Sequence, residues 1–167
     1  MSELVVRNRQ DTRNVDLRLF RDIARSLLTD LIAVEECELG VHLVGASEMA
    51  RLNEEFLKHR GSTDVIAFNH ADLRTACLHG EVFLCLDEAV TQAKRFRSSW
   101  QSELVRYLVH GILHLRGFGD STPDARRKMK REENRLLRLL ARTFPINRLA
   151  RPGPRRTNRT LRITSLR

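Results

Sequence analysis

One segment carries more information than any other part of this sequence: His110-Gly-Ile-Leu-His114-Leu-Arg-Gly117-Phe-Gly-Asp120. Two histidines four positions apart on a helix lie one turn apart on the same face, so both imidazoles can reach one cation. Gly117 is the residue type that ends a helix in a left-handed conformation and reverses the chain. That reversal would carry Asp120 back toward the histidines, and we therefore expect His110, His114 and Asp120 to hold a metal ion.

The spacing is that of the extended zinc-protease motif, except that Gly111 stands where such proteases carry glutamate. Two histidines and one carboxylate fill three of the four usual positions around zinc and leave one open, which is typical of catalytic sites. Histidine pairs at this spacing also occur as hydrogen-bonded core residues, but the glycine and the aspartate at the expected distances favour a metal site. The missing glutamate argues against peptide hydrolysis.

Two segments upstream add to the pattern, Ser62-Thr-Asp-Val-Ile-Ala-Phe68 and Gly80-Glu-Val-Phe-Leu-Cys85. With the histidine segment they resemble the bacterial YbeY family, metal-dependent endoribonucleases of ribosomal RNA maturation, over residues 3–142. The usual signature of that family is His-Gly-x-Leu-His-Leu-x-Gly-Tyr-Asp-His. This sequence matches it as far as Gly117 and then departs, with Asp120 in place of the third histidine. The resemblance implies one bound zinc, or another divalent metal, per chain.

The order of strand-like and helix-like segments predicts an α+β domain with the layers of an α/β protein. The resemblance implies a small mixed β-sheet of about four strands surrounded by about five helices, with the metal site at one end of a cleft. Asp16 is expected to cap an amphipathic helix that runs to about Val34, and Asp87 to cap another helix. His42 falls on the polar side of an alternating strand and is expected to face solvent.

Further candidates for catalysis come from the segments that resemble the family. Thr63, Asp64 and Glu81 are expected to line the cleft, and one carboxylate would act as general base in place of the absent glutamate. Glu81 is notable because it lies in an otherwise apolar strand, where an unpaired carboxylate is costly. The alternatives are that Glu81 faces solvent at an edge and that Asp64 caps a turn. Leu57 stands where the family commonly has arginine, so Lys58 or Arg60 would supply that charge, and Arg60 is the expected catalytic residue.

The charge of the chain points to an anionic partner. The formal net charge is +9, and nucleic acid is the first candidate for the partner of such a protein. An anionic membrane surface is a weaker candidate, because no basic amphipathic helix with large apolar anchors stands out. Lys58, Arg60 and Arg116 are candidate RNA contacts, unless they are ordinary solvated charges. The resemblance makes the expected partner a 16S ribosomal RNA precursor on or near the ribosome.

Two parts of the chain differ in composition. Residues 1–145 are expected to form one metal-dependent endoribonuclease domain, and residues 146–167 an arginine-rich tail that is disordered in isolation. The sequence contains neither a long apolar run nor a secretory signal, so we expect a cytoplasmic protein that does not enter a membrane. The three cysteines form no C-x-x-C pair, and they predict neither a disulfide nor a thiolate zinc site.

Three classes of function remain, and the sequence favours the first. It is a metal-dependent endoribonuclease of ribosomal RNA maturation and ribosome quality control, in which a His/His/Asp-bound zinc activates water or stabilises charge at the scissile phosphate. The second is a noncatalytic RNA-binding ribosome-assembly factor with a structural metal. The third is a zinc metalloprotease, which is weakened because Gly111 cannot transfer a proton.

Overall fold

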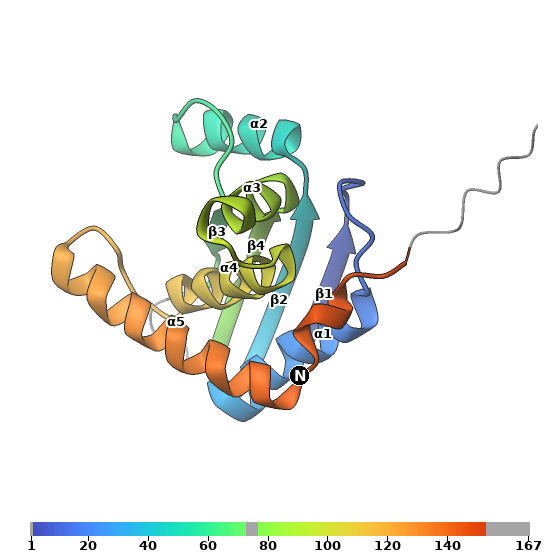
Figure 1. Cartoon of the computed structure of the whole chain (residues 1–167). Coiled ribbons are helices and arrows are strands. Elements are labelled where there is room, and N and C mark those ends of the chain that lie inside the picture. Colours follow the sequence, from blue (N-terminus) through green and yellow to red (C-terminus); the bar gives the residue numbers. More distant parts are fainter. Residues whose placement is uncertain (1, 73–76, 153–167) are drawn as a thin grey trace, which may run out of the picture.

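Four strands and five α-helices make up the computed structural model, which describes residues 2–72 and 77–152 (Figure 1). In chain order the elements are β1 (Glu3–Asn8), α1 (Leu17–Ser26), the π-helical turn η1 (Leu27–Leu31), β2 (Glu36–Val44), α2 (Ala46–Leu57), β3 (Val65–Asn69), β4 (Cys77–Cys85), α3 (Leu86–Phe96), α4 (Trp100–Leu115), α5 (Pro123–Thr143) and the 3-10 turn η2 (Ile146–Leu149). The α+β fold predicted from the sequence is confirmed. None of the helices described is long and apolar enough to cross a bilayer.

The sheet has the strand order β1-β2-β4-β3. β1 pairs with β2 and β2 pairs with β4 in parallel, whereas β3 runs antiparallel to β4 at the edge. Parallel neighbours need a crossover connection, and α1 supplies the first of these between β1 and β2. The sheet is therefore mixed, as expected.

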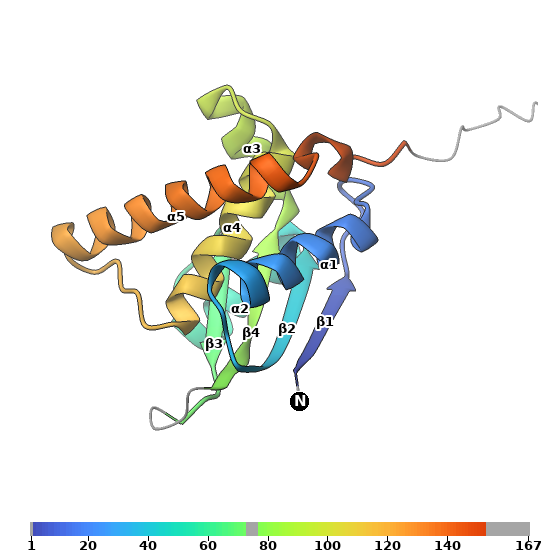
Figure 2. The ribbon, with the colours of Figure 1, turned by 90° about the horizontal axis from the view of Figure 1, so that it is seen from below.

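The two faces of the sheet are covered unequally. Helices α1 and α4 lie against one face of the sheet, and α5 packs on the outside of α4 (Figure 2). The main core on this face includes Val82 and Leu84 from β4 and Leu108 and Ile112 from α4. On the other face α2 covers only part of the sheet, over a small cluster that includes Met49. The remainder of this second face is open and forms a hollow of about 320 Å³.

Helix α4 approaches β4 unusually closely at Gly111. A Cβ atom added to Gly111 would lie 2.4 Å from Cγ1 of Val82 and 3.2 Å from Cγ1 of Val65. Real Cβ atoms do not come that near to another heavy atom, so only glycine allows the helix to lie at this depth. The contact fixes the helix that carries both histidines against the centre of the sheet.

Two cap predictions had different outcomes. Asp16 caps α1 as expected, because its Oδ1 accepts a hydrogen bond from the backbone N–H of Leu19 at 3.1 Å. The prediction for Asp87 is wrong, because α3 begins one residue earlier, at Leu86. Oδ2 of Asp87 instead accepts from the backbone N–H of Ala46 at 2.6 Å. The carboxylate thus accepts a hydrogen bond from the first residue of α2, whose N-cap residue, Gly45, has no side chain that could do so.

The structure differs from two other expectations. The helix predicted from Asp16 to about Val34 keeps its α-form only to Ser26 and continues as the π-helical turn η1. His42 does not face solvent, because its residue is only 6% exposed. Its ring stacks on Phe83 with 4.5 Å between centroids, on the face of the sheet that α2 partly covers. The contacts of this ring with Phe83 and Glu81 on the neighbouring strand β4 were not visible in the alternation of β2.

The packed part of the chain extends beyond residue 145. Leu149 in η2 is fully buried in the main core, and Ala150 forms an isolated bridge with Val15. The backbone N–H of Arg151 donates to the carbonyl of Asn14 at 2.9 Å. Residues 146–152, which the sequence assigned to the tail, therefore belong to the domain. The rest of the expected tail, 153–167, lies outside the described residues.

Substituting Gly111→Ala should lower the free energy of unfolding by about 1–3 kcal/mol, because the added methyl group overpacks the contact with Val82. Urea denaturation of the metal-free protein would measure this change. Gly119→Ala is the matched control, since a Cβ there meets no atom within 4 Å. Equal midpoints for the two variants would contradict the close approach of α4 to β4.

Candidate functional site

The end of α4 and the loop after it bring together three side chains whose donor atoms could hold one metal ion, and we call them the metal-binding cluster. Nε2 of His114 lies 3.0 Å from Nε2 of His110 and 3.3 Å from Oδ2 of Asp120. Nε2 of His110 lies 3.9 Å from the same carboxylate oxygen. Within residues 2–72 and 77–152 this is the only group of three or more His, Cys, Asp or Glu side chains with donor atoms so close together.

The loop returns to the helix because of Gly117. This residue has a φ of +94°, a left-handed conformation that glycine adopts without steric cost. Its N–H donates to the carbonyl of His114, and the N–H of Phe118 donates to that of Leu113, both at 3.0 Å. These bonds close the end of the helix and turn the chain back, so that Asp120 reaches the histidines. The chain reversal predicted from the sequence is confirmed.

The three donor atoms fit a zinc-sized ion. A tetrahedral ion with ligand bonds of about 2.0–2.1 Å holds its donor atoms roughly 3.3 Å apart. The separations of 3.0, 3.3 and 3.9 Å are close to that value. Imidazole nitrogens and a carboxylate oxygen are donors that zinc accepts, although other divalent metals use the same set. The side chains are partly open to solvent, with 25%, 29% and 51% exposure for His110, His114 and Asp120.

A buried carboxylate on α5 holds the first histidine in place. Oε2 of Glu133 lies 2.7 Å from Nδ1 of His110, and Oε1 accepts from Nη1 of Arg106 at 3.1 Å. An ionised carboxylate can only accept, so Nδ1 of His110 is the donor. Nε2 then directs its lone pair toward His114 and Asp120. This is the arrangement expected for a metal-binding histidine whose other ring nitrogen donates to a carboxylate.

The electrostatics of this pair favour the ionised carboxylate. Burial raises the pKa of Glu133, but the hydrogen bonds and charges of His110 and Arg106 outweigh burial and hold the pKa below its ordinary value. For His110, burial lowers the pKa, and the hydrogen bond and charge of Glu133 more than reverse that effect and raise the pKa. The negative charge of Glu133 therefore makes the imidazole more basic than a free one.

Sequence reasoning missed Glu133, although a signal was present. Met129, Glu133, Leu136 and Leu140 are the buried residues of α5 and follow one another at helical spacing. A single acid in such an apolar stripe needs a partner, because an unpaired buried charge is costly. The stripe alone does not identify the partner, which lies on another helix.

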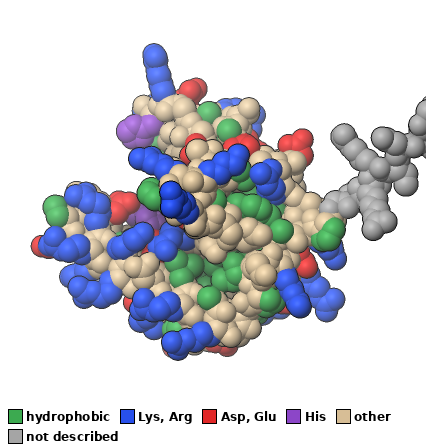
Figure 3. Space-filling model, viewed as in Figure 1, with side chains coloured by type: hydrophobic (Ala, Val, Ile, Leu, Met, Phe, Trp, Pro, Cys, Tyr) green, Lys and Arg blue, Asp and Glu red, His purple; other side chains and the backbone are tan. Residues whose placement is uncertain are grey.

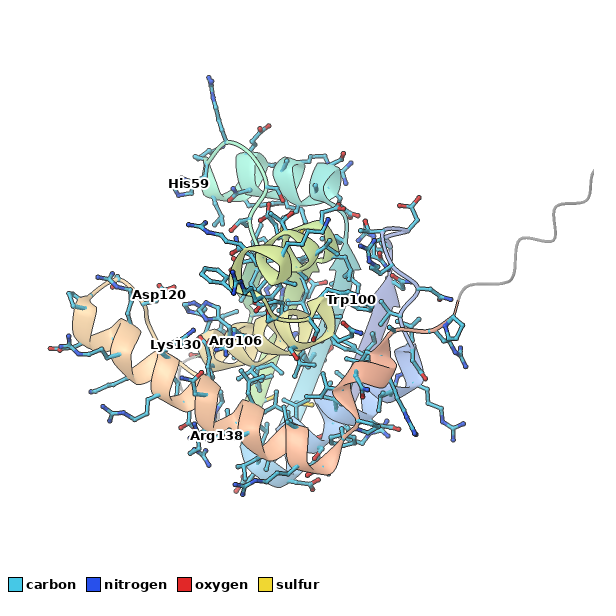
Figure 4. All side chains as sticks on the ribbon, viewed as in Figure 1. His59, Trp100, Arg106, Asp120, Lys130 and Arg138 are labelled. Atoms are coloured by element: carbon cyan, nitrogen blue, oxygen red, sulfur yellow. The ribbon has the colours of Figure 1, made fainter. Side chains whose placement is uncertain are left out.

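The metal-binding cluster opens into a groove of about 930 Å³ between α3, α4 and α5. Lys and Arg side chains gather around this part of the surface (Figure 3). Arg106 and Lys130 lie along the groove with Asp120 beyond them (Figure 4). The lining side chains include Asp64, Phe96, Arg106, Tyr107, His110, Asp120, Arg126, Arg127, Lys130 and Glu133.

The two candidate bases lie in different places. Asp64 lines the groove with His110, and its Oδ1 also accepts a hydrogen bond from the backbone N–H of Val65, the first residue of β3, at 2.8 Å. Glu81 lies on the second face of the sheet, because the next residue of β4, Val82, packs against α4. The structure therefore does not bring Glu81 to the metal-binding cluster.

Glu81 instead forms a separate cluster with two histidines. Its Oε1 lies 3.0 Å from Nε2 of His42 and its Oε2 lies 3.3 Å from Nε2 of His70. Burial raises the pKa of Glu81, but the hydrogen bonds from the histidines outweigh burial and lower it. These contacts, together with a side chain that is 43% exposed to solvent, explain how a carboxylate is tolerated in an apolar strand.

The three basic residues expected to bind RNA are exposed and stand apart from the groove. Lys58 ends α2 with a left-handed φ of +56°, Arg60 lies in the loop before β3, and Arg116 ends α4. None of them is among the residues that line the groove. The basic residues that do line it are Arg106 on α4 and Arg126, Arg127 and Lys130 on α5, which the sequence analysis did not single out.

Comparison with known proteins points to one family. Residues 5–141 match the family model described as Endoribonuclease YbeY. Curated proteins named Endoribonuclease YbeY include one from Acidothermus cellulolyticus, 37% identical over 73% of this chain and 81% of its own length. One from Chlorobium phaeovibrioides is 38% identical over 58% of this chain, and the alignment spans only 64% of that relative.

A solved structure supports the same fold. A solution structure of a protein from Thermotoga maritima matches with a TM-score of 0.63, covering 92% of this chain and all of that one. The two sequences are 21% identical. At that level of identity the likeness concerns the arrangement of helices and strands only.

Replacing Glu133→Gln should weaken zinc binding by about tenfold or more, since carboxylates that orient a ligating histidine commonly have effects of this size. Competition with a chromogenic chelator would measure the dissociation constant. Glu132→Gln is the control, because Glu132 pairs with Arg135 away from the site. If both variants bind zinc as tightly as the unchanged protein, Glu133 does not position His110.

Proposed function

The chain belongs to the YbeY family, and we propose that it is a metal-dependent endoribonuclease that cleaves a 16S ribosomal RNA precursor during ribosome maturation and quality control. One observation carries the proposal. A cluster of two imidazoles and a carboxylate opens into a groove that basic side chains line. Such a groove can accept the charged backbone of RNA and present one phosphate to the cluster.

The residues of the cluster have the roles of ligands in this proposal. His110, His114 and Asp120 hold a divalent cation, with zinc as the expected ion. When bound, the cation supplies a concentrated positive charge and Lewis acidity at the reacting phosphate. Glu133 keeps Nδ1 of His110 protonated, so that Nε2 is free for the ion.

Asp64 is the proposed general base. It is an exposed carboxylate that lines the same groove as His110, and a base must be within hydrogen-bond reach of the proton it takes. Glu81 has no such access from the second face of the sheet, and we assign it to the stability of that face. Lys58, Arg60 and Arg116 are proposed to contact phosphates of a longer RNA outside the groove.

The two alternative functions receive less support from the geometry. A protease of this motif needs a glutamate at position 111, where Val82 leaves no room for any side chain. A purely structural metal usually has four protein ligands in a closed site. Here three ligands are partly exposed beside a groove, which is the arrangement that a substrate requires.

Purified protein loaded with zinc should cleave a single-stranded RNA, and a chelator or His114→Ala should each reduce the rate at least about a hundredfold, because the cation contributes several kcal/mol to catalysis. Gel analysis of end-labelled RNA would measure the rate. His79→Ala is the control, because His79 lines the hollow on the opposite face of the sheet. Cleavage that persists after both treatments would remove the metal from the mechanism.

Replacing Asp64→Asn should slow cleavage by roughly 10²–10⁴-fold, the usual contribution of a general base, while zinc affinity stays unchanged. Glu81→Gln should leave the rate within about twofold, because Glu81 lies on the other face of the sheet. Single-turnover cleavage together with a zinc titration would separate an effect on the cleavage step from an effect on zinc binding. A large loss for Glu81→Gln and none for Asp64→Asn would reverse the assignment.

A further inference from the structure

The outer edge of β1 is open to a further strand. β1 stands at one end of the strand order β1-β2-β4-β3, and no strand of the described residues lies beyond it (Figure 2). Its register with β2 runs without interruption from Glu3 to Asn8, and the strand contains no proline. Most edge strands are shortened, bulged or covered, because an open edge pairs readily with another chain. β1 is therefore suited to accept a partner strand.

The pairing of β1 with β2 shows which of its backbone groups point outward. The N–H of Arg9, directly after the strand, donates to the carbonyl of Leu43 at 2.8 Å. Successive residues of a strand direct their N–H and C=O groups to opposite sides, so those of Leu4 and Val6 point away from β2. Among the described residues these outward groups have no hydrogen-bond partner. The edge thus presents unpaired donors and acceptors.

The side chains of β1 on the second face of the sheet carry opposite charges at the two ends of the strand. Glu3, Val5 and Arg7 line the hollow of about 320 Å³ on this face. Glu3 and Arg7 are both exposed, and within residues 2–72 and 77–152 neither has an ion-pair partner. Residues four apart on a strand are separated by about 13 Å, and the two charges do not meet within one chain.

The neighbours of these two residues on β2 leave both charges unbalanced. Glu3 is in register with Glu38, and Arg7 is in register with His42. Like charges directly opposite each other on a sheet are unfavourable. Glu38 has a cationic partner of its own when His79 is protonated, because its Oε2 lies 3.6 Å from Nε2 of that histidine. Glu3 therefore lies beside a second acid and lacks a cation, which a second molecule can supply.

We propose that β1 pairs antiparallel with β1 of a second copy of this chain, about a two-fold axis at Val5, so that the two sheets join into one. In this register Val5 lies opposite Val5 of the partner subunit, and Glu3 lies opposite Arg7 of the partner subunit. Leu4 of each chain faces Val6 of the other, and the two exchange backbone hydrogen bonds. A two-fold interface is self-complementary, so each ion pair forms twice.

The backbone and the charges select the same register. An antiparallel pair centred on Val5 needs outward backbone groups at Leu4 and Val6, which is where β1 has them. Glu3 and Arg7 then belong to the pairs without hydrogen bonds, in which opposing side chains are closest. Parallel pairing of the two strands in the same register would instead place acid opposite acid and cation opposite cation, which is unfavourable.

The proposed dimer leaves the groove at the metal-binding cluster open in each subunit. No residue of β1 lines that groove, so the inference goes beyond the proposed function and does not depend on it. A two-fold axis perpendicular to the sheet keeps the corresponding faces of both copies on the same side. The hollows on the second faces of the two subunits therefore adjoin, with Glu3 and Arg7 of both chains at the junction.

Sedimentation velocity of the full chain over a range of concentrations measures the dissociation constant of the dimer. Glu3→Arg and Arg7→Glu should each raise it by at least about tenfold, because each places like charges opposite one another at both ion pairs. The double variant should restore dimerisation, since both pairs form again with the charges exchanged. Glu55→Arg is the matched control, because it makes the same change of charge at an exposed position of α2.

A disulfide tests the register. Opposite residues in a pair without hydrogen bonds have Cα atoms about 4.5 Å apart, within the range that a disulfide spans. Val5→Cys should therefore give a cross-linked dimer on mild oxidation, seen on a non-reducing gel. Asn8→Cys is the control, because in this register the two copies of position 8 are about 20 Å apart. The unchanged protein controls for the native thiols Cys37, Cys77 and Cys85.

Four outcomes would overturn the proposal. The unchanged chain could sediment as a monomer at every concentration, or the two single variants could dimerise as tightly as Glu55→Arg does. The double variant could fail to restore the dimer, or Val5→Cys could cross-link no better than Asn8→Cys. Hydrogen exchange identifies the alternative occupant, because a monomer with protected amides at Leu4 and Val6 would mean that the chain covers its own edge.

Discussion

The contact between Gly111 and Val82 sets the position of everything that follows it on α4. Helix α4 lies against β4 at a depth that no side chain at position 111 would permit. His110 directly precedes this buried glycine and His114 follows one turn later, so packing on one side of the helix fixes where both rings stand on the other. The same contact excludes the glutamate that a protease of this motif would carry. The close approach of Gly111 to Val82 therefore both fixes the positions of the two histidines and excludes a glutamate between them.

Helix α5 completes the site from the opposite side. Its buried stripe holds it against α4, and within that stripe Glu133 contacts both His110 and Arg106. The half of α5 that faces the groove contributes Arg126 and Lys130. A single helix thus orients one histidine of the metal-binding cluster and supplies basic side chains to the groove. The third residue of the metal-binding cluster, Asp120, belongs to the loop that joins the two helices, where Arg126 donates to its backbone carbonyl at 3.2 Å.

Local patterns in the sequence predicted the features that depend on neighbours in the chain. The α+β fold, the cap at Asp16 and the reversal at Gly117 follow from spacing within a few residues. Three errors share one cause, which is contact between distant segments. Asp87 was expected to cap its own helix, but it reaches the start of α2. His42 was expected in solvent, but it stacks on Phe83. Glu133 was overlooked because its partner lies 23 positions away on another helix.

The position of Asp87 affects which segments of the molecule open together in local unfolding. One carboxylate accepts hydrogen bonds from the backbone of Ala46 and from the hydroxyl of Thr12, at 2.6 and 2.8 Å, while its own backbone belongs to the first turn of α3. Three segments that are far apart in the sequence thus share a single acceptor. Local opening at any one of them removes a bond from the others, so these segments form one cooperative unit in amide hydrogen exchange.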